Sequence, residues 1–407
     1  MSLLQAFMLW RRFERQQWLP QEHLEELQSR RLRALMRWAY ATVPYYHRVF
    51  RENGVRPEDI RTARDLRKLP VLTKQDVQEH SAALRSRNAK ALRSAATTGS
   101  TGIPLTVYQD ALSVAAGRAV MLRALRAHQV KLTDRMLRVT HRRHRQGLHE
   151  HLGILPVTSV SVHAPAHELA RAARKIKPNI IDAYPSVLEA MARHKHLLPR
   201  TVHHVFSTTE MLTPHARRNV QDAFGAPVID LYGAAEFPRL AWECPSGNGY
   251  HVDSDYAVIE YADDGMLVTG LYNCGMPLIR YAIGDLGMPG DGVCGCGRGL
   301  QVLERIEGRT DDALVMPDGS KISPRRVNVL DGLAGIRQYR IVQTRKDRIV
   351  AEVIPSRVMD DVLEAMIVTR IRQGLGRHPV DIFVKQIDAI PRGAGGKIRT
   401  VVSRVSR

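Results

Sequence analysis

Cysteine is scarce in this sequence and long hydrophobic runs are missing from it, and each absence argues against a class of protein. Four cysteines in 407 residues do not suggest a disulfide framework, so we expect a reducing compartment. No apolar run approaches the ~18 residues of a transmembrane helix. The first residues lack a basic region and a small-residue cleavage site, so we expect no signal peptide. These absences together predict a cytoplasmic protein without a membrane partner.

Acidic residues are also in deficit. The chain has 41 Asp and Glu against 60 Lys and Arg, a net charge of +19, which suits polyphosphate ligands such as ATP and CoA, an acidic carrier protein, or nucleic acid. The arginines are scattered, and no helix-turn-helix or RNA-binding signature is present, so nucleic acid is the least favoured of these partners. A basic surface without a specific partner is the simplest alternative.

A Walker-type phosphate loop is absent, because no G-x-x-x-x-G-K-[ST] string occurs. Residues 97–104 nevertheless hold two glycines, four hydroxyls and a proline between strand-like segments. Such a loop can turn tightly and direct backbone N–H and side-chain O–H donors at one anion. Taken alone, the stretch is explained equally well by an ordinary surface turn.

The pattern of apolar residues predicts three parts in the chain. Residues 1–93 have mainly helical periodicity, with one apolar stripe opposite Arg and Glu. Residues 94–307 begin with alternating strands and helices, typical of an α/β domain with a largely parallel sheet, and continue from about 250 as a small antiparallel β region. Residues 308–407 resemble a compact α+β unit of ferredoxin-like type. We therefore predict a large α/β N-terminal domain with a small β subdomain, followed by a small α+β C-terminal domain.

Strands are expected at 136–140, 179–184, 204–208 and 278–281, and helices at 110–127, 165–176, 185–197, 214–224, 324–333 and 357–375. Ligands of open α/β sheets bind beyond the carboxyl ends of the strands. The loops at these ends are therefore expected to converge with the phosphate-type loop: they are 184–186, 207–210 and 231–236.

Four separated motifs resemble the adenylate-forming ligase superfamily, and the layout is similar to its phenylacetate–CoA ligase-like branch. The motifs are the 97–102 loop, the string at 232–236, the segment 277–286 together with 308–312, and the terminal Gly396-Lys397. Each motif is moderately specific, whereas their order and spacing are highly specific. The resemblance covers nearly the whole chain, and it implies that 94–307 is the core of an adenylation domain and that 308–407 is mobile.

The resemblance implies a nucleotide site. The loop Thr97-Thr98-Gly99-Ser100-Thr101-Gly102 would cradle the β- and γ-phosphates of ATP, and Tyr232-Gly233 would bind adenine with the tyrosine stacked on the base. Asp285 would accept hydrogen bonds from both ribose hydroxyls, and Arg309 would contact the ribose or a phosphate. The ordinary alternatives are a strand end for the Tyr-Gly pair, a turn former for the aspartate and a surface charge for the arginine.

The same resemblance implies catalytic roles for Glu236 and Lys397. Glu236 would help to hold Mg²⁺, with an ion pair as its alternative. Lys397 would lie between the substrate carboxylate and the α-phosphate and stabilise the developing charge. A solvated lysine in a flexible tail is the alternative, although it fits the string Gly395-Gly396-Lys397 poorly.

The implied reaction has two steps. A small carboxylic acid attacks ATP and releases pyrophosphate, and the acyl group then passes to a thiol after the small domain swings about Arg309–Asp311. CoA is the default acceptor of this branch, and a phosphopantetheine thiol of an acyl carrier protein or an amine is the alternative. A catalytically silent relative is the competing hypothesis.

A second constellation has the chemistry of a metal site. Cys244, His251, Cys294 and Cys296 offer three thiolates and an imidazole, a closed ligand set for a structural Zn²⁺. Their spacing is not that of a standard zinc finger, so unligated buried thiols are the alternative.

Some features leave the substrate and the assembly open. The His- and Arg-rich stretch 141–151 either faces the acid pocket, favouring a polar or anionic acid, or is a solvated basic loop. Glu210 lies in a stretch, 207–212, that resembles the family, but the pattern predicts no role for it. Neither the acid nor the oligomeric state, a homodimer included, can be read from the sequence.

Overall fold

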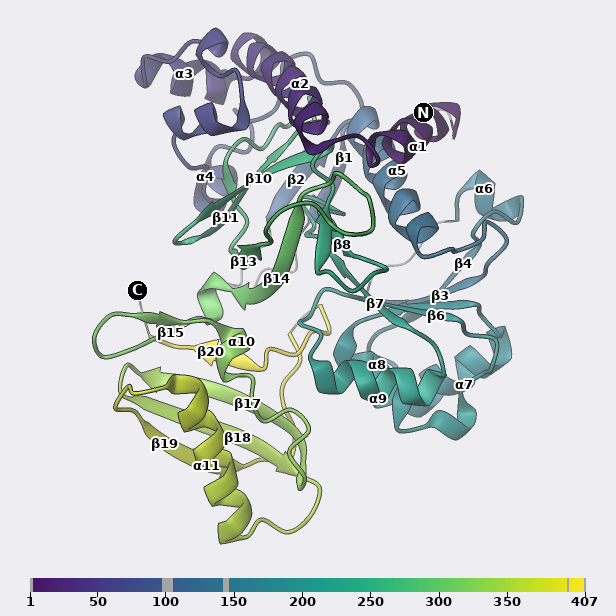
Figure 1. Ribbon diagram of the computed structural model, residues 1–407, viewed down its shortest axis with the longest axis vertical. Helices are drawn as coiled ribbons and strands as arrows, with labels where there is room; N and C mark the ends of the chain where they lie inside the picture. Colours follow the sequence, from purple (N-terminus) through teal and green to yellow (C-terminus); the bar gives the residue numbers. More distant parts are fainter. Residues whose placement is uncertain (1–2, 97–104, 142–145, 394, 406–407) are drawn as a thin grey trace. The chain divides into compact units, whose positions relative to one another are not determined.

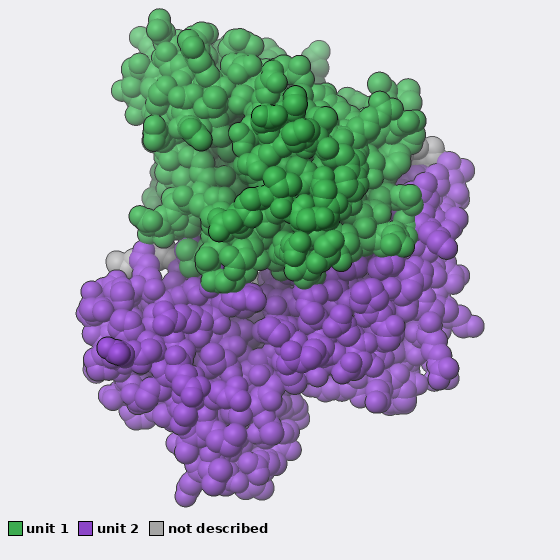
Figure 2. Space-filling view, in the orientation of Figure 1, with its two compact units in different colours: residues 1–130, 231–305 green, residues 131–230, 306–407 purple. Residues whose placement is uncertain are grey.

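The structure is a computed structural model of the chain that describes residues 3–96, 105–141, 146–393 and 395–405. It divides into two compact units, coloured separately in Figure 2: Met1–Val130 with Leu231–Arg305, and Lys131–Asp230 with Ile306–Arg407. Each unit thus combines two stretches of chain, and the predicted division at residues 93 and 307 stays a prediction. Among the described residues, no helix is both long enough and apolar enough to cross a membrane.

The first unit opens with helices. They are α1 (Leu3–Gln16), α2 (Gln21–Thr42), α3 (Pro44–Glu52), α4 (Lys74–Glu79) and α5 (Ala111–Ala127), with 3-10 turns at Pro57–Asp59 and Ala63–Lys68. The predicted apolar stripe of α2 is buried, including Leu24, Leu32 and Met36. Helix α5 begins after Asp110, whose side chain accepts from the Ser113 amide at 2.8 Å and so satisfies an unpaired N–H of the first turn.

Short strands complete the first unit. They are β1 (Arg93–Ala96), β2 (Thr106–Gln109), β8 (Ala241–Glu243), β9 (Tyr250–Val252), β10 (Ala257–Ala262), β11 (Gly265–Gly270), β12 (Tyr281–Ala282), β13 (Asp285–Pro289) and β14 (Val302–Arg309), the last of which continues into the second unit. Strands β10, β11 and β12 form the expected antiparallel sheet. The strand expected at 278–281 begins only at Tyr281, because Arg280 has a φ of 53° and cannot continue an extended strand.

The second unit contains the predicted parallel sheet. Its strands are β3 (Met136–Thr140), β4 (Val157–Ser161), β5 (Ile180–Ala183), β6 (His204–Thr208) and β7 (Val228–Tyr232), in the order β4-β3-β5-β6-β7, and β7 carries the chain into the first unit. Its helices are α6 (Leu148–His151), α7 (Ala166–Ile176), α8 (Pro185–Ala192) and α9 (Pro214–Phe224), with a 3-10 turn at Lys195–Leu197. The helix expected over 185–197 therefore ends five residues early, since its last predicted residues form that separate turn.

Helices α7, α8 and α9 lie together beside this sheet (Figure 1). Their apolar side chains, among them Leu169, Val187 and Val220, share one buried cluster with Leu137 and Val205 of the strands. This packing places the carboxyl ends of the strands beside the start of α8 and of α9.

The C-terminal stretch of the second unit is the expected α+β fold. It comprises a 3-10 turn at Thr310–Asp312, β15 (Leu314–Val315), β16 (Lys321–Ile322), α10 (Pro324–Val327), β17 (Ile336–Arg345), β18 (Arg348–Pro355), α11 (Asp361–Leu375), β19 (Asp381–Gln386) and β20 (Val401–Ser403). Strands β19-β18-β17-β20 form a sheet. Helix α11 begins later than predicted, because Asp360 caps it by accepting from the Leu363 amide at 2.7 Å. The helix expected over 324–333 is only one turn long.

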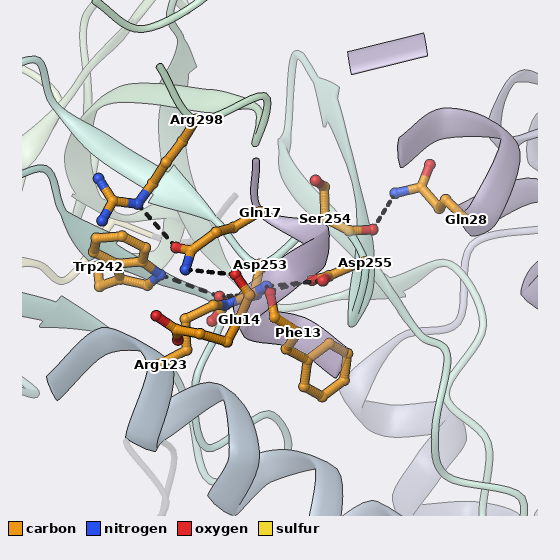
Figure 3. Close-up of polar contacts among 10 residues, drawn as sticks. All are labelled: Phe13, Glu14, Gln17, Gln28, Arg123, Trp242, Asp253, Ser254, Asp255 and Arg298. Atoms are coloured by element: carbon orange, nitrogen blue, oxygen red, sulfur yellow. Dashed lines mark hydrogen bonds and ion pairs between the residues drawn. The ribbon is translucent and has the colours of Figure 1, made fainter. Parts of the chain in front are cut away.

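A buried cation organises the first unit (Figure 3). Arg123 of α5 is fully buried; it donates to Asp253 at 2.5 Å and to both carboxylate oxygens of Asp255 at 2.8 Å. It also donates to the Phe13 carbonyl of α1 at 3.1 Å, and the Trp242 indole N–H reaches Asp253 at 3.1 Å. Burial raises the pKa of Asp253 to about 6, and Arg123 opposes this rise. One guanidinium thus joins two helices to the segment after β9.

Replacing Arg123 with alanine should lower the free energy of unfolding by roughly 3–5 kcal/mol, because Asp253 and Asp255 would remain buried without their cation. Urea denaturation followed by circular dichroism measures the change. The matched control is Arg48→Ala, which breaks a solvent-exposed pair with Glu52 and should cost less than about 1 kcal/mol. Similar losses in the two variants would contradict the organising role of Arg123.

Candidate functional site

Two predicted nucleotide-binding residues of the first unit meet directly. Tyr232 is the last residue of β7 and Asp285 the first of β13, and the tyrosine hydroxyl donates to the Asp285 carboxylate at 2.8 Å. Both side chains are buried, and Gly284 precedes the aspartate with a φ of 78°, a conformation that favours glycine. A carboxylate is the kind of acceptor that can take hydrogen bonds from ribose hydroxyls.

Glu236 lies in the same neighbourhood of the first unit, because its carboxylate accepts from the hydroxyl of Tyr281 at 2.9 Å. Gly233 has to be a glycine, since a Cβ there would lie 2.6 Å from the carbonyl oxygen of Pro238. Close packing at Gly233 thus accompanies the turn after β7, and Glu236 in this turn contacts Tyr281, the first residue of β12.

The predicted phosphate loop, Thr97-Thr98-Gly99-Ser100-Thr101-Gly102, lies outside the described residues. The strands that flank it, β1 and β2, pair antiparallel, with Ala96 opposite Thr106.

Arg309 and Lys397 belong to the second unit. Arg309 ends β14, and its guanidinium lies 3.9 Å from the Asp311 carboxylate in an exposed pair. Lys397 lies in a loop closed by two hydrogen bonds: the Gly393 amide donates to the Lys397 carbonyl at 2.9 Å, and the Gly396 amide to the Gly393 carbonyl at 2.8 Å. The lysine backbone is therefore held in a defined turn.

The four predicted metal ligands come together in the first unit. Their ligand atoms all lie within 4.8 Å of one another: Cys244, His251, Cys294 and Cys296. The Cys244 and Cys294 sulfurs are 3.6 Å apart, and the His251 Nε2 is 3.2 Å from the Cys296 sulfur.

This cluster fits a tetrahedral metal. A Zn–S bond of about 2.3 Å puts tetrahedral sulfurs about 3.8 Å apart, close to the 3.6 Å observed. Burial, together with the positive charge of Arg298, lowers the pKa of His251 to about 4, so the imidazole is neutral as a metal ligand requires. All the cysteines are free thiols, which leaves these sulfurs available to a metal.

The second unit holds a cavity of about 640 Å³ that the sequence did not predict. It lies among α8, α9 and the C-terminal stretch, and Glu189, His215 and Asp331 line it with ligand atoms within 4.8 Å of one another. These groups are partly exposed and have neighbours of their own: Asn219 contacts His215, and Thr213 donates to Asp331. The arrangement places like charges together where α8 and α9 face the C-terminal stretch.

Two contacts involve residues to which the sequence assigned no definite role. Glu210, just after β6, accepts from the amide and the hydroxyl of Ser186 and from the amide of Ile398. The signals available for Glu210 were its place directly after a buried strand and the similarity of the stretch 207–212 to the family.

His141 lies 3.1 Å from the hydroxyl of Tyr184, while Arg142 to Arg145 lie outside the described residues, so both explanations of this stretch stay open.

The chain is similar to known acid–CoA ligases. No protein-family model matches it. It is 27% identical to the phenylacetate–coenzyme A ligase of Thermus thermophilus over 94% of this chain and 97% of that protein, and 28% identical to the Escherichia coli protein of the same name over 72% and 73%. The solved structure of a 2-hydroxyisobutyryl-CoA ligase with 2-HIB-AMP matches it with a TM-score of 0.80 at 22% identity, covering 96% of this chain and 91% of that one. The predicted resemblance and fold class are confirmed.

Glu189 should make stability depend on pH, because its pKa is raised from 4.5 to about 7, mainly by burial and also by the nearby Asp331. A carboxyl with a raised pKa stabilises the fold fully below its unfolded value, and this contribution is lost as the pH rises to about 7. Between about pH 5 and pH 8 the wild type should lose roughly 1–3 kcal/mol more stability than Glu189→Gln, as measured by urea denaturation.

The control for this comparison is Glu168→Gln, since the Glu168 side chain is 59% exposed on α7. It should follow the wild type at both pH values. A Glu189→Gln variant with the same pH dependence as the wild type would show that Glu189 titrates normally.

Proposed function

We propose that this protein is an AMP-forming acid–thiol ligase. It is similar to one phenylacetate–CoA ligase over nearly its full length and to others over about three quarters of it, and it has the fold of the adenylate-forming acyl-CoA ligases. It joins a small carboxylic acid to ATP with release of pyrophosphate, and it then transfers the acyl group to CoA. The length of the match carries the proposal, because 94% of this chain aligns with 97% of a phenylacetate–CoA ligase. If the two proteins shared only one domain, the alignment would cover only part of each chain.

The nucleotide-binding roles follow the motifs. We assign the phosphates to Thr97 through Gly102, adenine to Tyr232-Gly233, the ribose hydroxyls to Asp285, and the ribose or a phosphate to Arg309. The contact between Tyr232 and Asp285 supports this assignment, since it puts an aromatic ring and a carboxylate acceptor side by side. A nucleoside needs such a pair, one to cover the base and one to hold the sugar.

The chemistry requires no general base, because a carboxylic acid is already ionised at neutral pH. Lys397 supplies positive charge to the carboxylate and α-phosphate oxygens, whose negative charge has to be stabilised during the displacement. Glu236 is the residue we assign to Mg²⁺, which when bound neutralises charge on the leaving pyrophosphate. The hydrogen bond from Tyr281 orients the Glu236 carboxylate and leaves its other oxygen for a further contact.

CoA is the acceptor that the relatives' names favour, and two of those names also suggest acids to try first. Phenylacetate and 2-hydroxyisobutyrate are therefore the first substrates to test. A carrier-protein phosphopantetheine thiol or an amine remains the alternative acceptor, and the basic charge of +19 would suit an acidic carrier equally well.

We further propose that Cys244, His251, Cys294 and Cys296 bind one structural Zn²⁺. Three thiolates and a neutral imidazole form a closed set without an open position, so the metal would stabilise the fold and not take part in the reaction. Arg298 donates to the Cys296 sulfur at 3.4 Å, the kind of outer contact that orients a metal ligand.

The adenylation step should depend on Lys397. With ATP, Mg²⁺ and a pool of acids that includes phenylacetate and 2-hydroxyisobutyrate, the wild type should release pyrophosphate and AMP, and Lys397→Ala should be slower by ~10²–10³-fold. The matched control is Lys385→Ala, an exposed lysine of β19, which should keep the wild-type rate. Loss of the CoA thiol in the same mixture reports the second step.

Products of a different kind would contradict the mechanism. ADP and phosphate in place of AMP and pyrophosphate would exclude adenylation. A folded wild type that uses no acid in a broad pool would favour the catalytically silent relative. Pyrophosphate release without consumption of CoA would favour a carrier protein or an amine as the acceptor.

Metal analysis tests the zinc proposal. The purified protein should contain about one zinc ion per chain, and the double variant Cys294→Ser, Cys296→Ser should lose it together with thermal stability. Cys274→Ser is the matched control, because Cys274 is the one cysteine outside the cluster and its loss should leave the metal in place. A metal-free wild type that is as stable as a zinc-treated sample would favour the unligated thiols.

A further inference from the structure

Glu210 follows the carboxyl end of β6 in a strained turn. The preceding residue, Thr209, has a φ of 83°. A β-branched residue in this conformation is a genuine outlier and costs about 1–3 kcal/mol, so the surrounding contacts must hold it in place. The strain redirects the chain immediately before Glu210, whose side chain is partly buried.

The Glu210 carboxylate joins two separate segments of the second unit. One oxygen accepts from the Ser186 amide at 3.0 Å, and the other accepts from the Ser186 hydroxyl at 3.2 Å and from the Ile398 amide at 2.8 Å. Ser186 lies in the first turn of α8, where backbone N–H groups lack helical partners and favour an anion. Burial raises the pKa of Glu210, and the Ile398 and Ser186 donors lower it, so the carboxylate depends on both segments for its stabilisation.

Ile398 directly follows Lys397, so this hydrogen bond holds the chain next to the lysine. On the other side, Gly396 packs so closely on Val162, just after β4, that a Cβ would lie 2.6 Å from a Val162 methyl carbon. Arg392 closes the turn by donating to the Gly396 carbonyl at 2.8 Å. The lysine backbone is thus held on both sides, by van der Waals contact at Gly396 and by a charge-assisted hydrogen bond at Ile398.

We propose that Glu210 is a positioning residue for Lys397: by accepting from the Ile398 amide, it holds the lysine-bearing loop in the place needed for adenylation. The inference rests on the proposed function of the chain. The carboxylate never needs to touch substrate, because it acts through the backbone of the loop. The same bond has to break when the lysine withdraws for acyl transfer, so Glu210 should matter for the first step and not for the second.

Separate assays of the two steps test this division. With phenylacetate, or the acid that the pool identifies, Glu210→Ala should reduce acid-dependent pyrophosphate release by ~10–100-fold, since a small misplacement of a catalytic group costs up to about that much. Transfer to CoA from the chemically prepared acyl-adenylate should stay within about two-fold of the wild-type rate. Glu210→Gln keeps one acceptor oxygen, so its rate of pyrophosphate release should lie between those of the wild type and Glu210→Ala. The control, Glu168→Ala on the exposed face of α7, should alter neither step.

A double variant shows whether Glu210 acts through Lys397. If it does, Glu210→Ala added to Lys397→Ala should slow adenylation by less than about three-fold beyond the lysine variant alone, because the positioned group is already missing. Full additivity of the two losses would overturn the proposal. Equal losses in adenylation and in acyl transfer would overturn it too, since they would indicate general damage to the fold.

Hydrogen exchange at the Ile398 amide gives a readout that needs no activity. Glu210→Ala should speed exchange there by roughly ten-fold or more, while Val205 amide exchange in the core strand β6 stays slow. Unchanged exchange at Ile398 would overturn the proposal even if the enzyme is active. A wild type without adenylation activity would contradict the proposed function instead, and the exchange result would then decide separately whether Glu210 holds the loop.

Discussion

The pairing of the buried guanidinium of Arg123 is the interaction on which the first unit depends. A charge without access to water is stable only where fixed partners surround it, so Asp253, Asp255 and the Phe13 carbonyl must all be in place together. Asp253 also receives the indole N–H of Trp242, whose ring lies 5.0 Å from that of His251. The metal-type cluster is therefore anchored to the same ionic centre as helices α1 and α5.

The second unit uses a partly buried carboxylate in a different way. Glu210 also joins distant segments, but one of its donors, the Ile398 amide, belongs to the loop that carries Lys397. Arg123 makes several bonds to packed elements, whereas Glu210 makes a single bond to the segment that we propose moves between the two steps of the reaction. A single hydrogen bond contributes about 1 kcal/mol, enough to favour one position of a loop without preventing its release.

The sequence predicted most of the fold, and it also supplied the candidate site residues, whose roles stay predictions. Hydrophobic periodicity indicated the parallel sheet and the C-terminal α+β part, since buried strands and amphipathic helices repeat locally. The errors lay at the ends of elements. There a helix cap such as Asp360, or a residue with left-handed backbone such as Arg280, sets where the helix or strand begins. Tyr232 and Asp285 were predicted as one site from separate strings, but their hydrogen bond, like that of Glu236 with Tyr281, joins residues about fifty positions apart.

Local chemistry alone therefore determined the α/β and α+β composition, the glycine and hydroxyl character of the predicted phosphate loop, and the proposed set of cysteine and histidine ligands. Tertiary structure alone decided which of many arginines pairs with Asp253 and Asp255 in the core, and which segments Glu210 contacts. The physical reason is that burial and hydrogen-bond partners are set by segments far apart in the chain. Arg123 and Arg126 lie on the same helix, and the local sequence does not distinguish them. Only the approach of Asp253 and Asp255, 130 and 132 residues away, gives Arg123 its buried ion pairs.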